Sequence, residues 1–295
     1  MNEFNQSDLK KIYIPASGSH KGQNGKLLVI GGSHLFHAAS LWSLEIASKI
    51  VDMVFYASVP ENEKIVQNAK EQFRNGIVIP REKIEAYIEE ADAVLIGPGM
   101  VRAEFQIPNF KYLISNREQI TEIKDEGEQT YYLTKYLLNK FPHKKWIIDA
   151  GALQMMELSS LASLSNAIIT PHPQEFEKVF GAKKMPEDTD SIVAEMAKKY
   201  HCVILFKGEK DIVCSPHGCV SISGGNAGMT KGGTGDVLAG LVGALACRND
   251  MFLAAKAGSF FNKKAGESLF AKVGYYFSTT DLLNEIPHVM KEYLF

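Results

Sequence analysis

Short apolar runs rich in β-branched residues alternate along this chain with longer stretches of helical periodicity. Six runs have the length and composition of buried strands, and they lie at residues 27–30, 53–57, 93–96, 146–148, 167–169 and 202–206. Amphipathic patterns between most of them predict helices over residues 38–50, 62–74, 152–163 and 190–200. This alternation predicts an α/β fold in which helices cover both faces of a mostly parallel central sheet.

A glycine-rich stretch at residues 224–243, GGNAGMTKGGTGDVLAGLVG, holds eight glycines and a single carboxylate, that of Asp236. Glycine adopts positive φ without steric cost and lets a ligand approach the bare backbone. Apolar residues at helical spacing after Asp236 predict a helix, with Thr234 as its N-cap. Because such a loop presents free N–H groups at the positive end of a helix dipole, the stretch predicts a phosphate site.

A carboxylate at this position repels phosphate, so Asp236 needs its own explanation. One reading is a charge that caps the first turn of the helix. The other is a base that accepts a proton during phosphoryl transfer, which is the reading we favour. With an ordinary pKa of about 3.9, the side chain is expected to be ionised at neutral pH.

The turns that follow the predicted strands carry further candidate residues. In open α/β sheets ligands bind outside the carboxyl ends of the strands, so these turns are expected to line one crevice. Lys207 directly follows an apolar run, where an ammonium either reaches solvent or meets an anion. His172 either donates to a ligand or bonds to backbone. Its spacing to Glu175 resembles a metal pair, but no third ligand accompanies it and no zinc site is expected.

Composition and absent motifs narrow the class of partner. The formal net charge is -2, and Lys and Arg are scattered, so no nucleic-acid partner is expected. Neither GxxxxGK[ST] nor GxGxxG occurs, so a bound nucleotide would have to use the loop at residues 228–235 for its phosphates. The polar N-terminus and the lack of an apolar run of about 18 residues predict a cytoplasmic protein with no membrane partner.

The four cysteines show no CxxC spacing. An intracellular chain of this size does not need a disulfide framework. We therefore expect Cys202, Cys214, Cys219 and Cys247 to be buried thiols.

The order of these motifs resembles the ADP- or ATP-dependent NAD(P)H-hydrate dehydratases of the ribokinase-like superfamily. The resemblance extends from about His20 to the final STTDLLNEIP, through HKGQNGKLLVIGGS, ADAVLIGPGM, WIIDAGAL, ITPHPQEF, VILFKGEKDIV and GGNAGMTKGGTGDVLAG. It implies a ribokinase-like three-layer α/β/α sandwich. It also implies a repair enzyme that phosphorylates the hydroxyl of the S-epimer of hydrated NADH or NADPH, after which phosphate leaves and the ring double bond is restored.

The resemblance also assigns residues. On the nucleotide side it places Lys207, Gly208, Glu209, Lys210, Asp211, Asn226, Gly232, Gly233, Thr234 and Gly235. On the hydrate side it places Ala39, Gly99, His172 and the base Asp236. Magnesium is expected because phosphoryl transfer needs a cation to offset charge, although no ligand for it can be named. A homo-oligomer is implied, with residues 1–295 as one domain and the epimerase for the hydrate on a separate chain.

Four departures from the family pattern bear on substrate specificity. The family's GPGLG reads GPGMV, so Val101 replaces a glycine and is expected to narrow the substrate mouth. The family's DADAL reads DAGAL, with Gly151 in place of a carboxylate, and Ala38 replaces a glycine after GGS. The segment at residues 101–140 is longer than the family suggests and is expected to form a lid or an oligomer contact.

Two other functions stay open at this stage. A ribokinase-like small-molecule kinase, acting for instance on a vitamin precursor, would release a stable phosphorylated product. A non-catalytic nucleotide-binding relative is compatible with the altered DAGAL and GPGMV turns.

Overall fold

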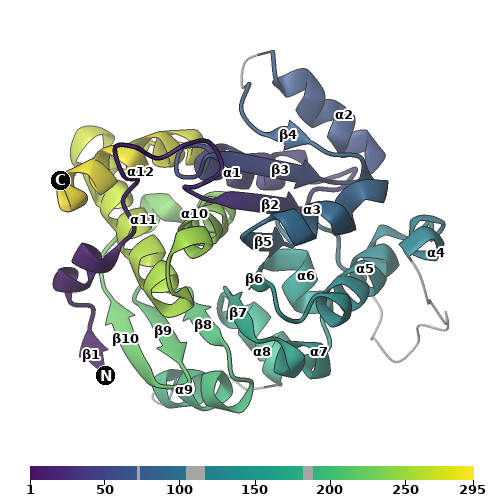
Figure 1. Cartoon of the computed structure of the whole chain (residues 1–295). Coiled ribbons are helices and arrows are strands. Elements are labelled where there is room, and N and C mark those ends of the chain that lie inside the picture. Colours follow the sequence, from purple (N-terminus) through teal and green to yellow (C-terminus); the bar gives the residue numbers. More distant parts are fainter. Residues whose placement is uncertain (72–73, 104–116, 182–188) are drawn as a thin grey trace.

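The structure is a computed structural model that describes residues 1–71, 74–103, 117–181 and 189–295. Within them, one sheet of ten strands runs in the order β1-β10-β9-β8-β7-β6-β5-β2-β3-β4 (Figure 1). All neighbours from β8 to β4 are parallel, whereas β9 is antiparallel to both β8 and β10. The strands are β1 (Asn2–Glu3), β2 (Lys26–Ile30), β3 (Met53–Ala57), β4 (Ile77–Val78), β5 (Ala93–Ile96), β6 (Lys145–Ile148), β7 (Asn166–Ile169), β8 (Val203–Phe206), β9 (Asp211–Ser215) and β10 (Gly218–Ile222).

Helices connect most of the strands. They are η1 (Gln6–Lys11), α1 (His37–Ser48), α2 (Pro60–Ala69), η2 (Arg81–Lys83), α3 (Ile84–Glu90), α4 (Arg117–Thr121), α5 (Glu126–Lys140), α6 (Ala150–Met155), α7 (Leu158–Ser163), α8 (Pro173–Phe180), α9 (Thr189–Lys199), η4 (Ala227–Thr230), α10 (Thr234–Arg248), α11 (Met251–Val273) and α12 (Thr279–Leu294). Among the described residues, none of these helices has the length and apolar character needed to cross a membrane.

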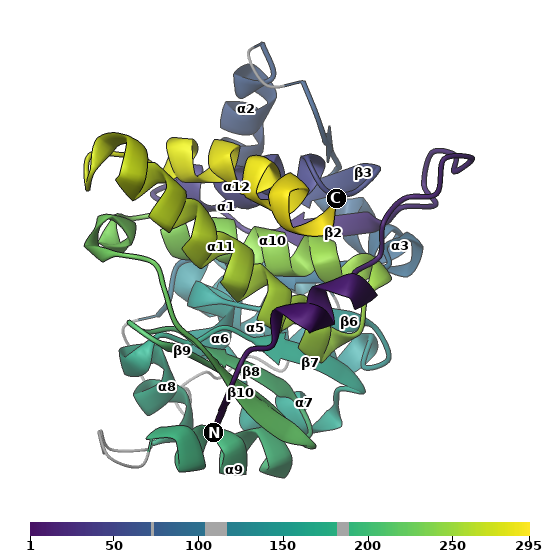
Figure 2. The same ribbon diagram turned by 90° about the vertical axis from the view of Figure 1, so that its left-hand side faces the viewer.

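The predicted three-layer α/β/α sandwich is confirmed by the way the sheet divides the core. Alternate residues of a strand face opposite sides of its sheet. Leu27 and Val29 of β2 therefore pack with α1, α10, α11 and α12, while Leu28 and Ile30 pack with α3 and with the helices from α5 to α9. Figure 2 shows α11 and α12 lying across the first of these faces.

The six predicted strands are confirmed to within one residue at each end. The predicted helix over residues 152–163 is wrong as a single element, because the chain is extended at Met156 and Glu157 between α6 and α7. This break lets the Glu157 carboxylate accept a hydrogen bond from Lys135 Nζ at 2.8 Å. Of the predicted lid or oligomer contact at residues 101–140, residues 104–116 lie outside the described residues.

The prediction that all four cysteines are thiols is wrong for two of them. The antiparallel hairpin of β9 and β10 places Cys214 opposite Cys219, and a disulfide joins them. Sequence spacing did not reveal this pair, because opposition across a hairpin depends on its register. Cys202 and Cys247 are free and buried, as expected.

The strand order reverses between β2 and β5, since β2 pairs with both β3 and β5. Ligand sites in open α/β sheets lie at such a switch point, beyond the carboxyl ends of the strands. The turns after β2, β5, β6, β7 and β8 all lie at this carboxyl-end edge of the sheet.

The disulfide predicts how many free thiols the protein carries, and a titration with a thiol reagent can measure that number. Denatured, unreduced protein is expected to show the two thiols of Cys202 and Cys247, and reduced protein four. Replacing Cys214 and Cys219 together with Ser is expected to cost about 2 kcal/mol of unfolding free energy, because a short loop loses its constraint in the unfolded chain. Four thiols before reduction would contradict the disulfide.

Candidate functional site

The glycine-rich loop leads into α10 as predicted, but its N-cap is Gly233 and the assignment to Thr234 is wrong. Thr234 Oγ1 donates back to the loop, to Met229 O at 2.7 Å and Lys231 O at 3.0 Å, so it does not accept from the helix. Gly233 has a φ of +98°, and a Cβ there would lie 2.2 Å from a ring carbon of Trp42. Only glycine fits this position, because both the backbone conformation and the neighbouring ring exclude a side chain.

Gly235, two residues later, is constrained by neither factor. Its φ is not positive, and the nearest atom that an added Cβ would meet is Lys207 Nζ at 3.6 Å. The space over the first turn of α10 is therefore open beside an ammonium group. Such a helix start presents unpaired N–H groups to an anion.

Lys207 does meet anions, and these are carboxylates of the protein. Its Nζ lies 3.0 Å from Asp149 Oδ1 and 3.8 Å from Glu175 Oε2. The Asp149 side chain is 2% exposed and also accepts from Thr170 Oγ1 at 2.7 Å. Burial alone would lower the pKa of Lys207, but Asp149 and Glu175 more than offset it and raise that pKa. The lysine is therefore a fixed positive charge at this edge of the sheet.

Asp236 is not the ordinary carboxylate that we expected. Burial and the nearby Asp149 charge raise its pKa to about 7, while Lys207 acts in the opposite direction. The prediction of full ionisation at neutral pH is therefore wrong. A carboxyl with this pKa is matched to proton transfer near neutral pH.

The backbone that presents Asp149 is strained. Ala150, the next residue, has a φ of 46°, which is costly for a residue with a Cβ. Such conformations persist where the surrounding structure imposes them, and they cluster at functional sites. Here the conformation turns the chain from β6 into α6 directly behind the Asp149 carboxylate.

His172 caps α8, which starts at Pro173 and ends before Gly181. His172 Nδ1 accepts from the backbone N–H groups of Gln174 and Glu175 at 3.2 and 3.4 Å. In return, Glu175 Oε2 accepts from His172 N at 3.0 Å. Nδ1 is therefore bonded to backbone, which is one of the two alternatives for this side chain. Nε2 lies 3.5 Å from Glu175 Oε2, and the His172 side chain is 44% exposed.

A cavity of about 1620 Å³, counting the part open to solvent, lies beside the start of α10. Of the residues assigned to the nucleotide, those lining it are Lys207, Gly208, Glu209, Lys210, Asp211, Asn226, Thr234 and Gly235. Gly232 and Gly233 do not line it. Sequence analysis missed Asn262 and Lys263 on its wall, although polar residues in the mostly apolar α11 were a usable signal.

Ala39 and Gly99, which the sequence predicts to face the substrate, are neighbours. A Cβ on Gly99 would lie 3.1 Å from that of Ala39, and the φ of Gly99 is +72°. Ser43, one turn further along α1, donates to the backbone carbonyl of Asp236 at 2.8 Å. The helix that carries Ala39 is thus bonded to the start of the helix that carries Asp236.

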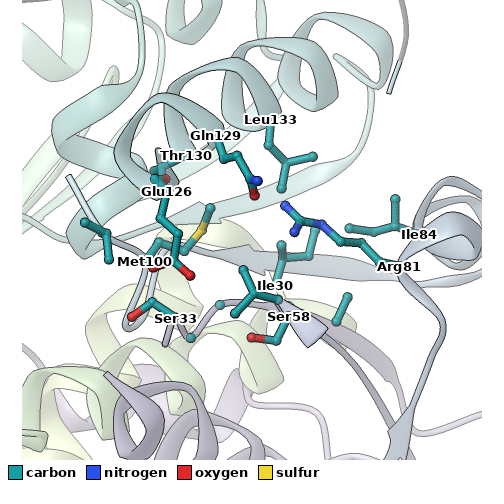
Figure 3. Close-up of a pocket in the computed structure, with 15 residues that line it drawn as sticks. Ile30, Ser33, Ser58, Arg81, Ile84, Met100, Glu126, Gln129, Thr130 and Leu133 are labelled. Atoms are coloured by element: carbon teal, nitrogen blue, oxygen red, sulfur yellow. The ribbon is translucent and has the colours of Figure 1, made fainter. Parts of the chain in front are cut away.

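A second, smaller cavity of about 380 Å³, partly open to solvent, is lined by the turns after β2, β3 and β5 and by α5. Figure 3 shows Arg81 reaching into it, with Glu126 and Gln129 pointing in from α5. Burial lowers the pKa of Arg81, and the charges of Glu63 and Glu126 act in the opposite direction. Sequence analysis missed Arg81, which lies in no recognised motif.

Gly151, one of the departures from the family pattern, lies against the turn after β5. A Cβ on Gly151 would lie 2.1 Å from the carbonyl oxygen of Met100. Val101, the next residue, lines the smaller cavity. An aspartate in place of Gly151 is therefore incompatible with this path of the turn after β5.

The described residues contain no group of three or more His, Cys, Asp or Glu side chains placed to hold a metal ion. The pair of His172 and Glu175 is engaged in capping α8.

Comparison with known proteins identifies the family. The family model for NAD(P)H-hydrate dehydratase matches residues 27–288. The chain is 36% identical over 292 residues to a bifunctional NAD(P)H-hydrate repair enzyme of Methanocaldococcus jannaschii, covering 96% of this chain and 52% of that protein. It is 31% identical to an ADP-dependent (S)-NAD(P)H-hydrate dehydratase of Nitrosopumilus maritimus, covering 97% of this chain and 96% of that protein. The chain therefore spans about half the length of the bifunctional relative.

Solved structures confirm the ribokinase-like fold. An ADP/ATP-dependent NAD(P)H-hydrate dehydratase from Bacillus subtilis, co-crystallised with ATP and Mg²⁺, is similar with a TM-score of 0.76 and 20% identity, covering 99% of this chain and 98% of that one. Ribokinase from Thermotoga maritima is similar with a TM-score of 0.56 and 10% identity, covering 90% and 99%. With the family model matching most of its length, the chain belongs to the NAD(P)H-hydrate dehydratase family.

Proposed function

We propose that this chain dehydrates the S-epimer of hydrated NADH or NADPH at the expense of a nucleoside phosphate. The hydroxyl of the hydrated ring attacks the terminal phosphoryl group, Asp236 accepts its proton, and AMP leaves from ADP (or ADP from ATP). The C–O bond to the new phosphate group then breaks, and the adjacent ring carbon releases a proton to solvent as the ring double bond forms. The relative from Nitrosopumilus maritimus is named ADP-dependent, so we propose ADP as the donor, with ATP to be tested beside it.

The observation that carries the proposal is the position of Asp236. Its carboxyl has a pKa of about 7 and belongs to the first turn of α10, next to the open space at Gly235. Its backbone is bonded to α1 through Ser43, one turn from Ala39. A pure phosphate site gains nothing from a carboxyl here, whereas a proton acceptor between a phosphate donor and a hydroxyl substrate does.

The remaining assigned residues bind and orient the reactants in this proposal. Lys207 and the first turn of α10 face the phosphates, and residues 208–211 with Asn226 hold the rest of the nucleotide. Gly232 and Gly233 shape the loop, since neither lines the larger cavity. Ala39, Gly99 and the Nε2–H of His172 face the hydrate.

Magnesium is proposed to enter with the nucleotide. Mg²⁺ usually binds through substrate phosphates, waters and one or two carboxylates, and the described residues offer no three-ligand protein cage. When bound it offsets charge on the transferring phosphoryl group. Family resemblance further leads us to propose that the chain acts as a homo-oligomer and that an epimerase for the hydrate is its functional partner.

One assay distinguishes a dehydratase from a small-molecule kinase and from a non-catalytic nucleotide-binding protein. The protein is incubated with hydrated NADH, Mg²⁺ and either ADP or ATP, and the absorbance of NADH is followed. We expect that absorbance to recover. A stable phosphorylated product without recovery would support a kinase, and nucleotide binding without turnover would support a non-catalytic relative.

Asp236→Asn tests the base. We expect the variant to fold, to bind nucleotide at least as tightly, and to lose roughly 10²- to 10⁴-fold in turnover. Because the folded-state pKa of about 7 exceeds the ordinary 3.8, the stability that the protonated carboxyl contributes is lost as pH rises towards 7. The variant is therefore expected to melt above the parent at pH 8 and close to it at pH 4. Near-normal turnover with a lowered melting temperature at pH 8 would show that Asp236 only caps its helix.

The pH profile tests the charges around Asp236. The rate with limiting hydrate is expected to rise about tenfold per pH unit on the acid side and to level off above a pH of about 7. Lys207→Met is expected to move this limb to higher pH, because it removes a charge that favours the carboxylate. Asp149→Asn is expected to move it to lower pH. Profiles that do not move in either variant would contradict Asp236 as the titrating group.

Gly233 and Gly235 provide a matched pair. Gly233→Ala is expected to destabilise the fold, because φ is +98° and Trp42 occupies the space. Gly235→Ala fits without a clash, so it is expected to leave the melting temperature within a few degrees while weakening ADP and ATP binding severalfold by filling the space beside Lys207. Calorimetry on the folded variant measures its affinity for ADP and ATP. An affinity equal to that of the parent in Gly235→Ala would show that the first turn of α10 does not bind the nucleotide.

A further inference from the structure

A buried lysine ammonium joins two segments that line the larger cavity. Lys263 lies in the middle of α11, and its side chain is 7% exposed. Its Nζ donates to Gly208 O at 3.1 Å, to Glu209 O at 2.9 Å and to Gly224 O at 3.3 Å. Asp211 Oδ1 is also 3.3 Å away. A buried charge is costly unless it is surrounded by such partners.

The partners come from both sides of the β9–β10 hairpin. Gly208 and Glu209 belong to the turn before β9, whereas Gly224 belongs to the loop after β10. Both segments line the cavity proposed for the nucleotide. Lys263 therefore fixes the distance between the two walls of this cavity.

Asp211 contributes to the same arrangement, because each of its carboxylate oxygens accepts a hydrogen bond from the protein. Its Oδ1 accepts from Gly208 N at 2.9 Å, and its Oδ2 accepts from Ser259 Oγ at 2.7 Å. Ser259 lies one turn before Lys263 on α11. One turn beyond Lys263, Glu267 Oε1 accepts from Gly225 N at 3.2 Å. Successive turns of α11 thus hold both walls.

We propose that Lys263 is a positioning residue whose ammonium occupies a cage of oxygens equivalent to a monovalent-cation site. Three carbonyls and one carboxylate are the ligands that a K⁺ or NH₄⁺ ion takes in proteins, and carbonyl cages replace the hydration shell of such ions. The Lys263 ammonium makes its contacts with oxygens of the protein. It therefore acts on the nucleotide indirectly, through residues 208–211 and 224–225. The inference rests on the proposed nucleotide site.

The test measures ADP and ATP binding by calorimetry, in a buffer whose only cation is Tris. Lys263→Ala empties the cage, and it is expected to weaken both nucleotides by about tenfold or more, because charge-assisted hydrogen bonds to both walls are lost. Ammonium or potassium chloride is expected to restore most of that affinity. Lithium chloride at equal ionic strength, with an ion too small for the cage, is expected to restore little.

Two further variants keep the test decisive. Lys263→Met retains the aliphatic stem, so it is measurable if the alanine variant does not fold, and it is expected to bind weakly without a response to ammonium. Lys256→Ala is the matched control, since Lys256 is also buried on α11 but pairs with Asp8 at 2.7 Å, away from the cavity. It is expected to lose stability and keep parental affinity.

Parental affinity in folded Lys263 variants, or an equal loss in Lys256→Ala, would overturn the positioning role. Weak binding in Lys263→Ala that ammonium does not restore would overturn the cage. A parent protein that binds neither ADP nor ATP would instead refute the proposed nucleotide site, so the two failures are distinguishable.

Discussion

A lysine ammonium held against two buried carboxylates is the interaction on which the site depends. Lys207 follows β8, Asp149 follows β6, and Glu175 lies in the first turn of α8, so one cluster joins three turns that are distant in sequence. Removing a single partner would leave an uncompensated buried charge, which costs far more than the loss of an exposed ion pair. The same charges act on Asp236 with opposite signs, and together with burial they bring its pKa to about 7. Packing, charge and proposed chemistry thus meet at this edge of the sheet.

The conformation of the glycine-rich loop depends on helices from both ends of the chain. Trp42 of α1 occupies the space next to Gly233, and Ser43 of the same helix donates to the Asp236 carbonyl. On the other side, the Gly266 carbonyl of α11 accepts from Asn226 Nδ2 at 2.7 Å. A change in the packing of either helix would therefore be transmitted to the first turn of α10 without touching a ligand.

Sequence periodicity was sufficient for the six central parallel strands and for α1, α2, α9 and α10, because continuous apolar runs and helical spacing are local properties. It missed the two-residue strands β1 and β4, and it missed β9 and β10, which mix polar and apolar residues and whose pairing depends on hairpin register. Thr234 is a residue type that is common at N-caps, but the N-cap of α10 is Gly233. The Trp42 ring leaves no room for a side chain at that position. The pKa of Asp236 was missed for a similar reason, since it depends on Asp149 and Lys207, which only the fold brings near.

The contact between Gly151 and the Met100 carbonyl ties the DAGAL departure to the backbone path of the turn after β5. With 2.1 Å between that oxygen and the position of a Cβ, an aspartate cannot be restored at residue 151 while the turn after β5 keeps its present path. A carboxylate at residue 151 would therefore have to displace the backbone of the neighbouring turn. A homologue's aspartate transplanted to this position alone would report that displacement as much as the role of the side chain.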